Sequence, residues 1–261
     1  MSEDRARELS PGRYLVEQEL SDALVAWPDL LILNQPITHL TAFEHLWKHS
    51  SYRVCADGGA NRLFDVFQGE LIEQRNRYLP DIVHGDLDSL RNDVHDYYRD
   101  QGVLISRDGD QESTDFGKCM QKISSRVSLS GMRDILVLGT LAGRVDQGLG
   151  LLHEMIREET KHPNLRLWLF SESSLSLIIK AGETILRGVQ ASRVFTENVG
   201  LIPIYGPAVI STEGLEWDVK QWATRMGGQV STSNHVKADC IRIETDAPIL
   251  FTIEIAPLNT S

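Results

Sequence analysis

Residues 53–89, RVCADGGANRLFDVFQGELIEQRNRYLPDIVHGDLDS, contain two short apolar runs separated by a segment with helical spacing. The runs Arg53–Ala56 and Asp81–His84 have the length and composition of buried strands, and Ala60–Phe67 repeats its apolar residues as a helix does. Strands joined by a crossover helix run parallel to each other. This stretch therefore predicts a β-α-β unit, and each of its two strands is followed closely by Asp beside Gly.

The same alternation continues on both sides of that unit, from residue 29 to residue 172. The predicted strands are Leu30–Asn34, Arg53–Ala56, Asp81–His84, Val103–Ser106, Ile135–Leu138 and Leu165–Phe170. Segments with helical spacing lie between them. Alternating strands and helices predict an α/β domain, a parallel sheet with helices on both faces.

Beyond Ser171 the helical spacing nearly vanishes, and short strand-like runs follow one another between Gly, Pro and Asn. Residues 173–261 are expected to form a small antiparallel β-sandwich or barrel. Leu175–Lys180 and Glu183–Arg187 flank Ala181-Gly182, and this pattern predicts a tight hairpin. Residues 1–28 are polar and lack a strong apolar period, so we expect a weakly ordered arm or a single peripheral helix.

Composition narrows the class of protein. The 261 residues carry 26 Lys and Arg against 37 Asp and Glu, a net charge of −11 that disfavours binding to nucleic acid. The three cysteines have no zinc or disulfide spacing and are expected to be reduced thiols in the cytoplasm. We expect no signal peptide and no membrane association, because the N-terminal residues are charged throughout and no run is long and apolar enough to span a bilayer.

The ends of the predicted strands carry the candidate chemistry, because ligands of parallel α/β sheets bind outside the carboxyl ends of the strands. Four successive strand ends present Asp near Gly, at Asp57, Asp86 with Asp88, Asp115 and Asp146. In an extended segment Asp86 and Asp88 would point the same way and could share one Mg²⁺, a cation usually held by one or two carboxylates and substrate phosphates.

Plainer interpretations stay open for each of these residues. Asp86 and Asp88 could belong to a solvated loop, and Asp115 could be a charge at a helix start rather than a metal ligand or a base. Arg144 could hold phosphate oxygens or be a surface charge. The chain has no GxxxxGK[ST], GxGxxG or GxSxG motif, which excludes a P-loop and gives no support to a dinucleotide fingerprint or a serine nucleophile elbow.

In the β region, Ser231, Ser233 and His235 alternate onto one face of a predicted strand. That face could bind a small polar heterocycle or simply meet solvent. Trp217 could stack on a ring, although a single Trp is more often a core residue.

Six segments together resemble the thiamine pyrophosphokinase family of eukaryotes, the fungal form most closely. They are CADGGANRLFD (55–65), LPDIVHGDLDS (79–89), DQESTDFGKC (110–119), LGTLAGRVDQ (138–147), GLEWDV (214–219) and VSTSN (230–234). The resemblance implies transfer of the pyrophosphoryl group of ATP to the thiamine hydroxyl, with Mg²⁺, to give AMP and thiamine diphosphate. It also implies a homodimer with its active sites between subunits.

The resemblance further assigns roles to residues. The expected catalytic residues are Asp86, Asp88, Asp115 and Arg144, the first three also holding the metal. The expected nucleotide contacts are Asp57, Gly58, Asn61, Gly139, Arg144, Asp146 and Gln147. The expected thiamine contacts are Gln111, Thr114, Trp217, Ser231, Ser233 and Asn234. Some family members have an aromatic residue where this chain has Val236, so His235 or Trp217 is expected to replace it.

Two other functions remain to be weighed. A metal-dependent nucleotide-sugar transferase also uses a D-x-D pair, but it would give no role to Ser231 or Asn234. A non-catalytic thiamine or nucleotide sensor would be expected to lose the metal carboxylates, whereas Asp86, Asp88 and Asp115 are all present.

Overall fold

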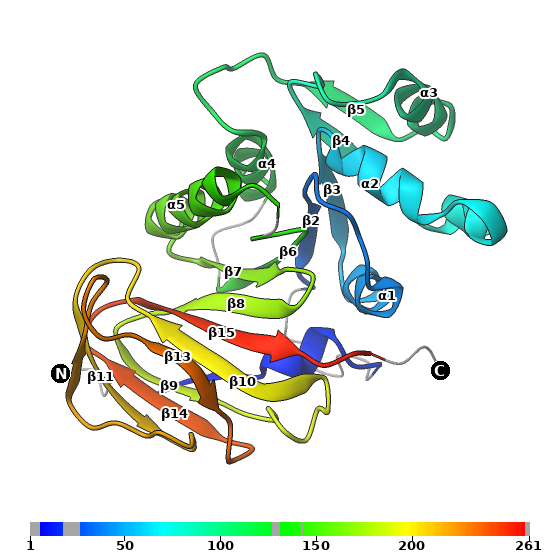
Figure 1. Ribbon diagram of the computed structural model, residues 1–261. Helices are drawn as coiled ribbons and strands as arrows, with labels where there is room; N and C mark the ends of the chain where they lie inside the picture. Colours follow the sequence, from blue (N-terminus) through cyan, green and yellow to red (C-terminus); the bar gives the residue numbers. More distant parts are fainter. Residues whose placement is uncertain (1–5, 18–26, 127–130, 142, 259–261) are drawn as a thin grey trace. The chain divides into compact units, whose positions relative to one another are not determined.

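The computed structural model describes residues 6–17, 27–126, 131–141 and 143–258. The chain forms two compact units, shown in Figure 1. Leu20–Glu172 forms the first, which we name the α/β unit; Met1–Glu19 and Ser173–Ser261 form the second, which we name the β unit.

The sheet of the α/β unit is parallel throughout. Its strands are β2 (Asp29–Ile32), β3 (Tyr52–Ala56), β4 (Ile82–Gly85), β5 (Leu104–Arg107), β6 (Arg133–Leu138) and β7 (Leu165–Phe170). They pair in the order β7-β6-β2-β3-β4-β5. In β2, Leu30, Leu31 and Ile32 are all fully buried, as expected for a strand covered on both faces. The predicted parallel α/β domain is confirmed.

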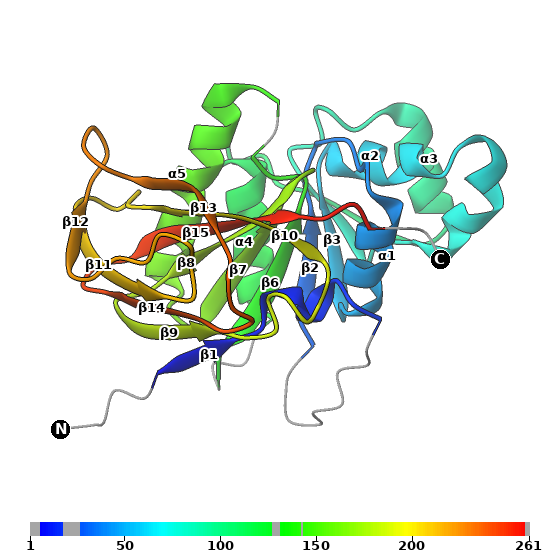
Figure 2. The same cartoon turned by 60° about the horizontal axis from the view of Figure 1, so that its bottom comes forward.

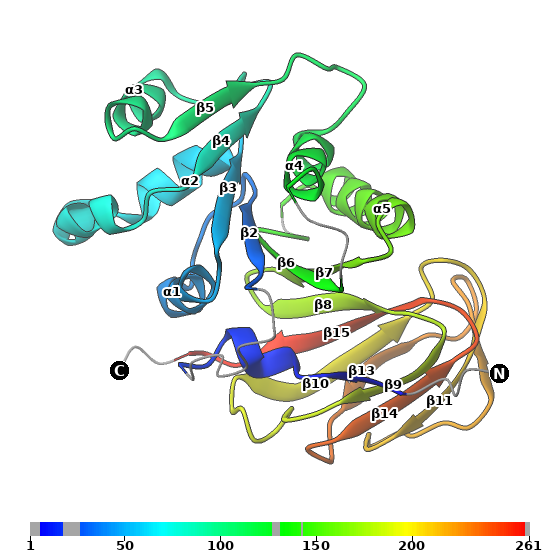
Figure 3. The same ribbon diagram turned by 180° about the vertical axis from the view of Figure 1, so that it is seen from behind.

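Helices cover both faces of this sheet. They are α1 (Leu40–Lys48), α2 (Gly59–Val66), α3 (Asn92–Asp100), α4 (Asp115–Ser124) and α5 (Val145–Lys161), with a 3₁₀ segment η2 (Gly69–Arg77). Figures 1 and 3 show α4 and α5 on one face and α1, α2 and α3 on the other. In the described part of the chain, no helix combines the length and apolar composition that a membrane crossing requires.

The strand order contains a topological switch point. From β2 the chain adds β3, β4 and β5 on one side, then crosses over to add β6 and β7 on the other. The segments leaving β2 and β6 therefore diverge at the carboxyl edge of the sheet, which is where open α/β sheets bind ligands.

The β unit contains two groups of strands, which Figure 2 shows as separate layers. One has the order β1-β9-β14-β11-β12, and in the other β13, β10, β15 and β8 pair in turn, all antiparallel. The strands are β1 (Arg7–Leu9), β8 (Ser174–Ile179), β9 (Gly182–Leu186), β10 (Phe195–Ile202), β11 (Ala208–Glu213), β12 (Trp222–Thr224), β13 (Ser231–His235), β14 (Ile241–Thr245) and β15 (Ile249–Ile255). Residues of β11 and β14 alternate between buried and less buried, so each strand turns one face to the core. The predicted antiparallel β region is confirmed.

The predicted hairpin at Ala181-Gly182 is wrong, although both of its strands exist. β8 pairs with β15, whereas β9 pairs with β14 and β1, so the two strands belong to different layers. Gly182 has φ +100°, a left-handed conformation that lets the chain turn the corner between layers. A hairpin and a corner have the same sequence pattern, because both need two apolar runs and a glycine.

The N-terminal residues also differ from the expected arm. Arg7–Leu9 is strand β1, which pairs parallel with β9, and Pro11–Tyr14 forms the 3₁₀ helix η1. Tyr14 and Leu15 are almost completely buried. This segment is therefore part of the β unit's core, and it is too short for its apolar pattern to stand out in the sequence. The rest of the expected arm, residues 1–5 and 18–26, lies outside the described residues.

Candidate active site

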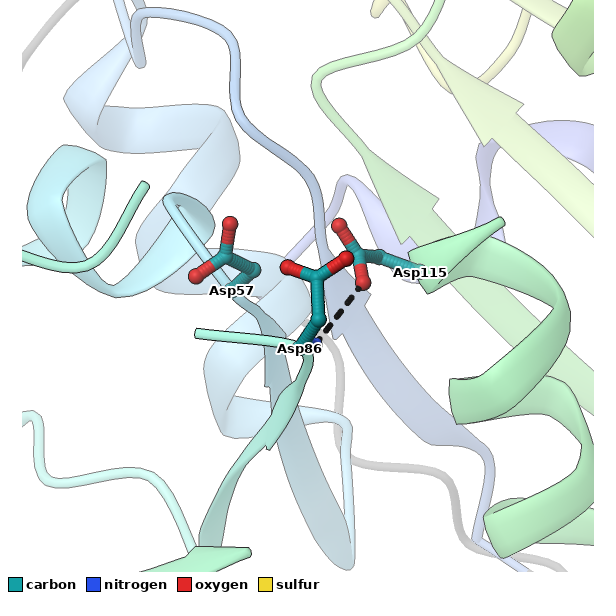
Figure 4. Close-up of side chains that lie close together, drawn as sticks. All are labelled: Asp57, Asp86 and Asp115. Carbon is teal, nitrogen blue, oxygen red and sulfur yellow. Dashed lines mark hydrogen bonds between the residues drawn. The ribbon is translucent and has the colours of Figure 1, made fainter. Parts of the chain in front are cut away.

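Three carboxylates gather at the carboxyl edge of the parallel sheet. Asp57 follows β3, Asp86 follows β4, and Asp115 is the first residue of α4. Each offers one oxygen atom, and the three oxygens lie within 4.8 Å of one another (Figure 4). The backbone N–H of Asp86 also donates a hydrogen bond to Oδ1 of Asp115 at 3.3 Å. Adjacent parallel strands end at the same edge, which is why residues far apart in sequence meet here.

The backbone around this carboxylate group is unusually tight. Gly85 has φ +152°, and a Cβ atom placed there would lie 2.8 Å from Oδ1 of Asp115 and 3.0 Å from Cβ of Asp57. Asp57 itself has φ +42°, a left-handed conformation that is rare outside glycine. The close approach of the three side chains therefore depends on a glycine at position 85.

Asp57 shows most clearly that the group is suited to a cation. Its side chain is 2% exposed; Oδ2 accepts a hydrogen bond from the backbone N–H of Ser89, but Oδ1 is buried without a hydrogen-bond partner. Burial raises the pKa of Asp57, and the nearby charge of Asp115 raises it further. A buried carboxylate oxygen without a donor is costly unless a cation binds it. Oxygen ligands are also those that Mg²⁺ prefers, so the residues fit this metal.

Lys118 joins the carboxylates from the second turn of α4. Its side chain is 2% exposed, and Nζ lies 3.3 Å from Oδ2 of Asp86 and 3.4 Å from Oδ1 of Asp115. Burial alone would lower the pKa of Lys118, but bonding to Asp86 and the charges of both carboxylates outweigh it, so the pKa is raised. Lys118 is buried because the helix turns this side chain toward the sheet rather than toward solvent.

Asp88 does not join Asp57, Asp86 and Asp115 in the described structure. Leu87 has φ +64°, so the segment is not extended, and the condition under which Asp86 and Asp88 were expected to point the same way is not met. Instead, the Asp88 N–H donates to Oδ1 of Asp86, and Oδ1 of Asp88 accepts from the Ser89 hydroxyl. Burial alone would raise the pKa of Asp86, but the hydrogen bond from the Asp88 N–H and the contact with Lys118 outweigh it, so the pKa is lowered. A metal-ligand role for Asp88 stays a prediction.

A cavity of about 680 Å³ opens at the switch point, between the ends of β2 and β6 and the first turns of α5. Its lining includes the predicted residues Thr114, Gly139, Arg144, Asp146 and Gln147. Arg144 and Asp146 are exposed and form an ion pair at 2.6 Å. Thr114 accepts a hydrogen bond from the Gly117 N–H, so its hydroxyl caps α4. Gly139 has φ +83°, which a side chain would disfavour.

Sequence reasoning missed four polar residues of this cavity: Asn34, Gln35, Arg62 and Glu154. Asn34 and Gln35 lie two and three residues after the end of β2, and the Asn34 side chain accepts a hydrogen bond from Arg62. The strand-end rule that selected the other candidates would have found them had it been applied to the first strand as well. Arg62 and Glu154 lie within helices and gave no comparable signal.

Asn61 and Gly58 each lie close to residues of a neighbouring segment of the chain. The Asn61 amide donates to the Ser89 carbonyl and accepts from the Arg91 N–H, which ties α2 to the loop carrying Asp86. A Cβ atom at Gly58 would lie 2.4 Å from the Asn34 side chain. Gln111 is exposed in the loop before α4. Direct nucleotide or substrate contacts by these three residues stay predictions.

Contacts link three residues of the β unit, Trp217, Asn234 and His235. Trp217 is 54% exposed, and its ring lies 5.1 Å from that of His235. Asn234 is buried; its amide accepts from the Trp217 N–H and donates to the Trp217 carbonyl. Ser233 is exposed, with φ +57°. Val236 is buried, so it offers no surface for a ligand.

Fold and site together define a class of protein: parallel α/β proteins with a group of carboxylates that could hold a cation at the carboxyl edge of the sheet, beside a cavity. Residues 43–169 match the family description "Thiamin pyrophosphokinase, catalytic domain", and residues 185–250 match "Thiamin pyrophosphokinase, vitamin B1 binding domain". The chain belongs to the thiamine pyrophosphokinase family.

Individual relatives agree with this assignment. The chain is 39% identical to thiamine pyrophosphokinase 1 of Arabidopsis thaliana, covering 89% of this chain and 88% of the relative. It is 31% identical to the Saccharomyces cerevisiae enzyme, covering 87% and 85%. The solved structure of thiamin pyrophosphokinase from Candida albicans superposes with a TM-score of 0.82 at 27% identity, covering 96% of this chain and 94% of that one. The comparisons support the eukaryotic family without favouring its fungal branch.

Proposed function

We propose that this protein transfers the pyrophosphoryl group of ATP to the hydroxyl of thiamine, giving thiamine diphosphate and AMP. The observation that carries the proposal is that one chain matches both the catalytic and the vitamin-B1-binding regions of the family while keeping three acidic side chains within 4.8 Å. The thiamine hydroxyl attacks the β-phosphorus of ATP, and AMP leaves.

Different residues would bind the cation and the nucleotide in this reaction. Asp57, Asp86 and Asp115 would hold a divalent cation, with Asp88 as a further candidate, and the cation would neutralise charge on the phosphates. The cavity at the switch point would hold the nucleotide, with Arg144 exchanging its ion pair with Asp146 for phosphate oxygens. Because phosphoryl transfer depends mainly on positioning and charge neutralisation, no covalent help from the protein is needed.

Incubation with ATP, Mg²⁺ and thiamine tests the proposal directly. Chromatography is expected to find AMP and thiamine diphosphate in equal amounts, and neither product when EDTA is present. ADP with thiamine monophosphate would refute pyrophosphoryl transfer. A folded protein that makes no product would instead support the sensor interpretation.

Cys55, Cys119 and Cys240 are all free thiols, which supports a reducing compartment such as the cytoplasm.

Trp217 is proposed as the surface on which thiamine stacks, with Asn234 holding its backbone. Trp217→Ala is expected to raise the KM for thiamine at least about fivefold with little change in stability, since stacking on an exposed ring contributes of the order of 1 kcal/mol or more. Asn234→Ala is expected to raise the same KM and also to lower the free energy of unfolding by about 1–3 kcal/mol, because it removes buried hydrogen bonds. Steady-state kinetics and thermal unfolding measure both. Trp222→Ala is the control, because the Trp222 ring N–H donates a hydrogen bond to Gln229 and Trp222 is not among the expected thiamine contacts. An equal change in the KM for thiamine in Trp222→Ala would refute the assignment of Trp217 as the stacking surface.

A homodimer with the active site completed between subunits is part of the proposal. On α5, Val145 is 78% exposed and Leu149 is 63% exposed, close to the cavity residues Arg144 and Asp146, and association would cover such apolar side chains. Light scattering is expected to give about twice the chain mass of 29.3 kDa. At a thiamine concentration below the KM, a mixture of Asp86→Asn and Trp217→Ala proteins is expected after subunit exchange to recover activity beyond the sum of the two separate proteins, because one site of the mixed dimer is intact. A monomeric mass, or no recovery, would contradict the shared site.

A further inference from the structure

A permanent cation already lies within the carboxylate group. Lys118 extends from α4, three residues after Asp115, and its ammonium contacts both Asp86 and Asp115 in an almost fully buried position. Among the described residues, no other Lys, Arg or His side chain forms an ion pair with Asp57, Asp86 or Asp115. Nor does Lys118 reach every oxygen, because Oδ1 of Asp57 is buried without a hydrogen-bond partner.

The charges in this group can be balanced simply. Three ionised carboxylates and one ammonium leave a net charge of −2, the charge that one divalent cation neutralises. Without Lys118, the three carboxylates with one divalent cation would keep a net negative charge. Without Lys118 and without the cation, the three close carboxylates would repel one another. Burial strengthens both effects, because charges in the interior are poorly screened by water.

We propose that Lys118 is a built-in counter-ion of the metal centre, a positioning residue that holds Asp86 and Asp115 together when no metal is bound and weakens cation binding when no nucleotide is present. This inference rests on the proposed function in taking the carboxylates as the metal site. It makes stable cation binding depend on the phosphates of the nucleotide, which supply the further negative charge that Lys118 has offset. The centre is thereby kept assembled but only weakly occupied until ATP arrives.

The test compares Lys118→Met with wild type and with Lys122→Met, without nucleotide. Met keeps an unbranched side chain of similar length, and Lys122 lies one turn further along α4 without an ion pair to the carboxylates. Binding of Mn²⁺ is followed by the electron paramagnetic resonance signal of the free ion, and thermal unfolding is measured in EDTA and in MgCl₂. We expect Lys118→Met to bind Mn²⁺ at least about tenfold more tightly than wild type. In EDTA we also expect Lys118→Met to unfold at a lower temperature than wild type. MgCl₂ should raise the melting temperature of Lys118→Met by more than it raises that of wild type. Lys122→Met is expected to match wild type in all three.

Unchanged or weaker Mn²⁺ binding by Lys118→Met would overturn the proposal, as would equal melting temperatures of the Lys118 and Lys122 variants in EDTA. If Lys118→Met does not fold in EDTA, the double variant Lys118→Met with Asp86→Asn removes one charge of each sign and is expected to restore folding. Failure of the double variant to fold would also count against the proposal. These measurements use no substrate, so they can fail while wild type still makes thiamine diphosphate, and the product assay can fail while they succeed.

Discussion

Asp86→Asn is expected to reduce kcat by at least about 10²–10³-fold, because it replaces a charged oxygen in the group of three carboxylates that would hold the cation. Asn keeps the shape of the side chain and the fold. The free energy of unfolding is expected to fall by only about 1.5–3 kcal/mol, because Lys118 loses one of its two carboxylate partners and keeps Asp115. Steady-state assays with ATP and thiamine measure the first effect, and denaturant unfolding measures the second.

Asp100→Asn provides the matched control. Asp100 lies at the end of α3 in the same unit, is exposed, and pairs only with Arg99 among the ion pairs of the described residues. It should retain the wild-type rate. Wild-type turnover by Asp86→Asn would remove Asp86 from the metal centre. Asp88→Asn, assayed beside it, decides whether Asp88 becomes a ligand when substrates bind.

The general layout of the site could be predicted because it follows from one rule about parallel sheets. Strand periodicity predicts β3 and β4, and their carboxyl ends must lie side by side, so the sequence alone indicates that Asp57 and Asp86 are neighbours. The same rule applied to β2 would have found Asn34 and Gln35. What it could not supply was the direction of each side chain, because that depends on the local backbone conformation. Leu87 at φ +64° turns Asp88 away from the place that an extended segment would have given it.

Lys118 and the layer change at Gly182 depend instead on tertiary structure. Helical spacing gave no sign that a lysine three residues after Asp115 would be 2% exposed. Its burial is tolerated only because two carboxylates from different segments meet it there. Likewise, β8 pairs with β15 and β9 with β14, which lie about 60 residues or more further along the chain, and β9 also pairs with β1 near the N-terminus. The sequence around Ala181 therefore cannot predict strand-pairing partners that lie so far away along the chain.

Residues with a strained backbone conformation lie in the same segments as the candidate site residues. Among the described residues other than glycine, six have positive φ, and four of these lie in the segments singled out from the sequence: Asp57, Leu87, Leu141 and Ser233. Each such conformation costs of the order of 1–3 kcal/mol and persists only where the surroundings enforce it. The concentration of this strain at the strand ends and in β13 supports an active site that folding pre-organises rather than one that substrates must assemble.

Gly85→Ala should disturb the group of three carboxylates without changing any of its charges. The new methyl group would lie 2.8 Å from Oδ1 of Asp115 and 3.0 Å from Cβ of Asp57, at a backbone φ of +152° that a side chain disfavours. Asp115 must then move away, and with it the hydrogen bond from the Asp86 N–H. We expect kcat to fall at least about a hundredfold, since a displacement of about 1 Å in catalytic groups has that effect. Stability should fall by about 1–3 kcal/mol.

Gly109→Ala separates this steric effect from a general cost of replacing glycine. Gly109 lies in the exposed loop between β5 and α4, and a Cβ atom there would meet nothing within 4 Å. Its variant is expected to keep the wild-type rate and Mn²⁺ binding. Equal losses in the two variants would mean that the loops tolerate no alanine at all. Full activity in Gly85→Ala would show that the three carboxylates need not approach as closely as they do here. Loss of activity and Mn²⁺ binding in Gly85→Ala alone would make the close approach itself a requirement, because the substitution leaves every ligand atom in the sequence.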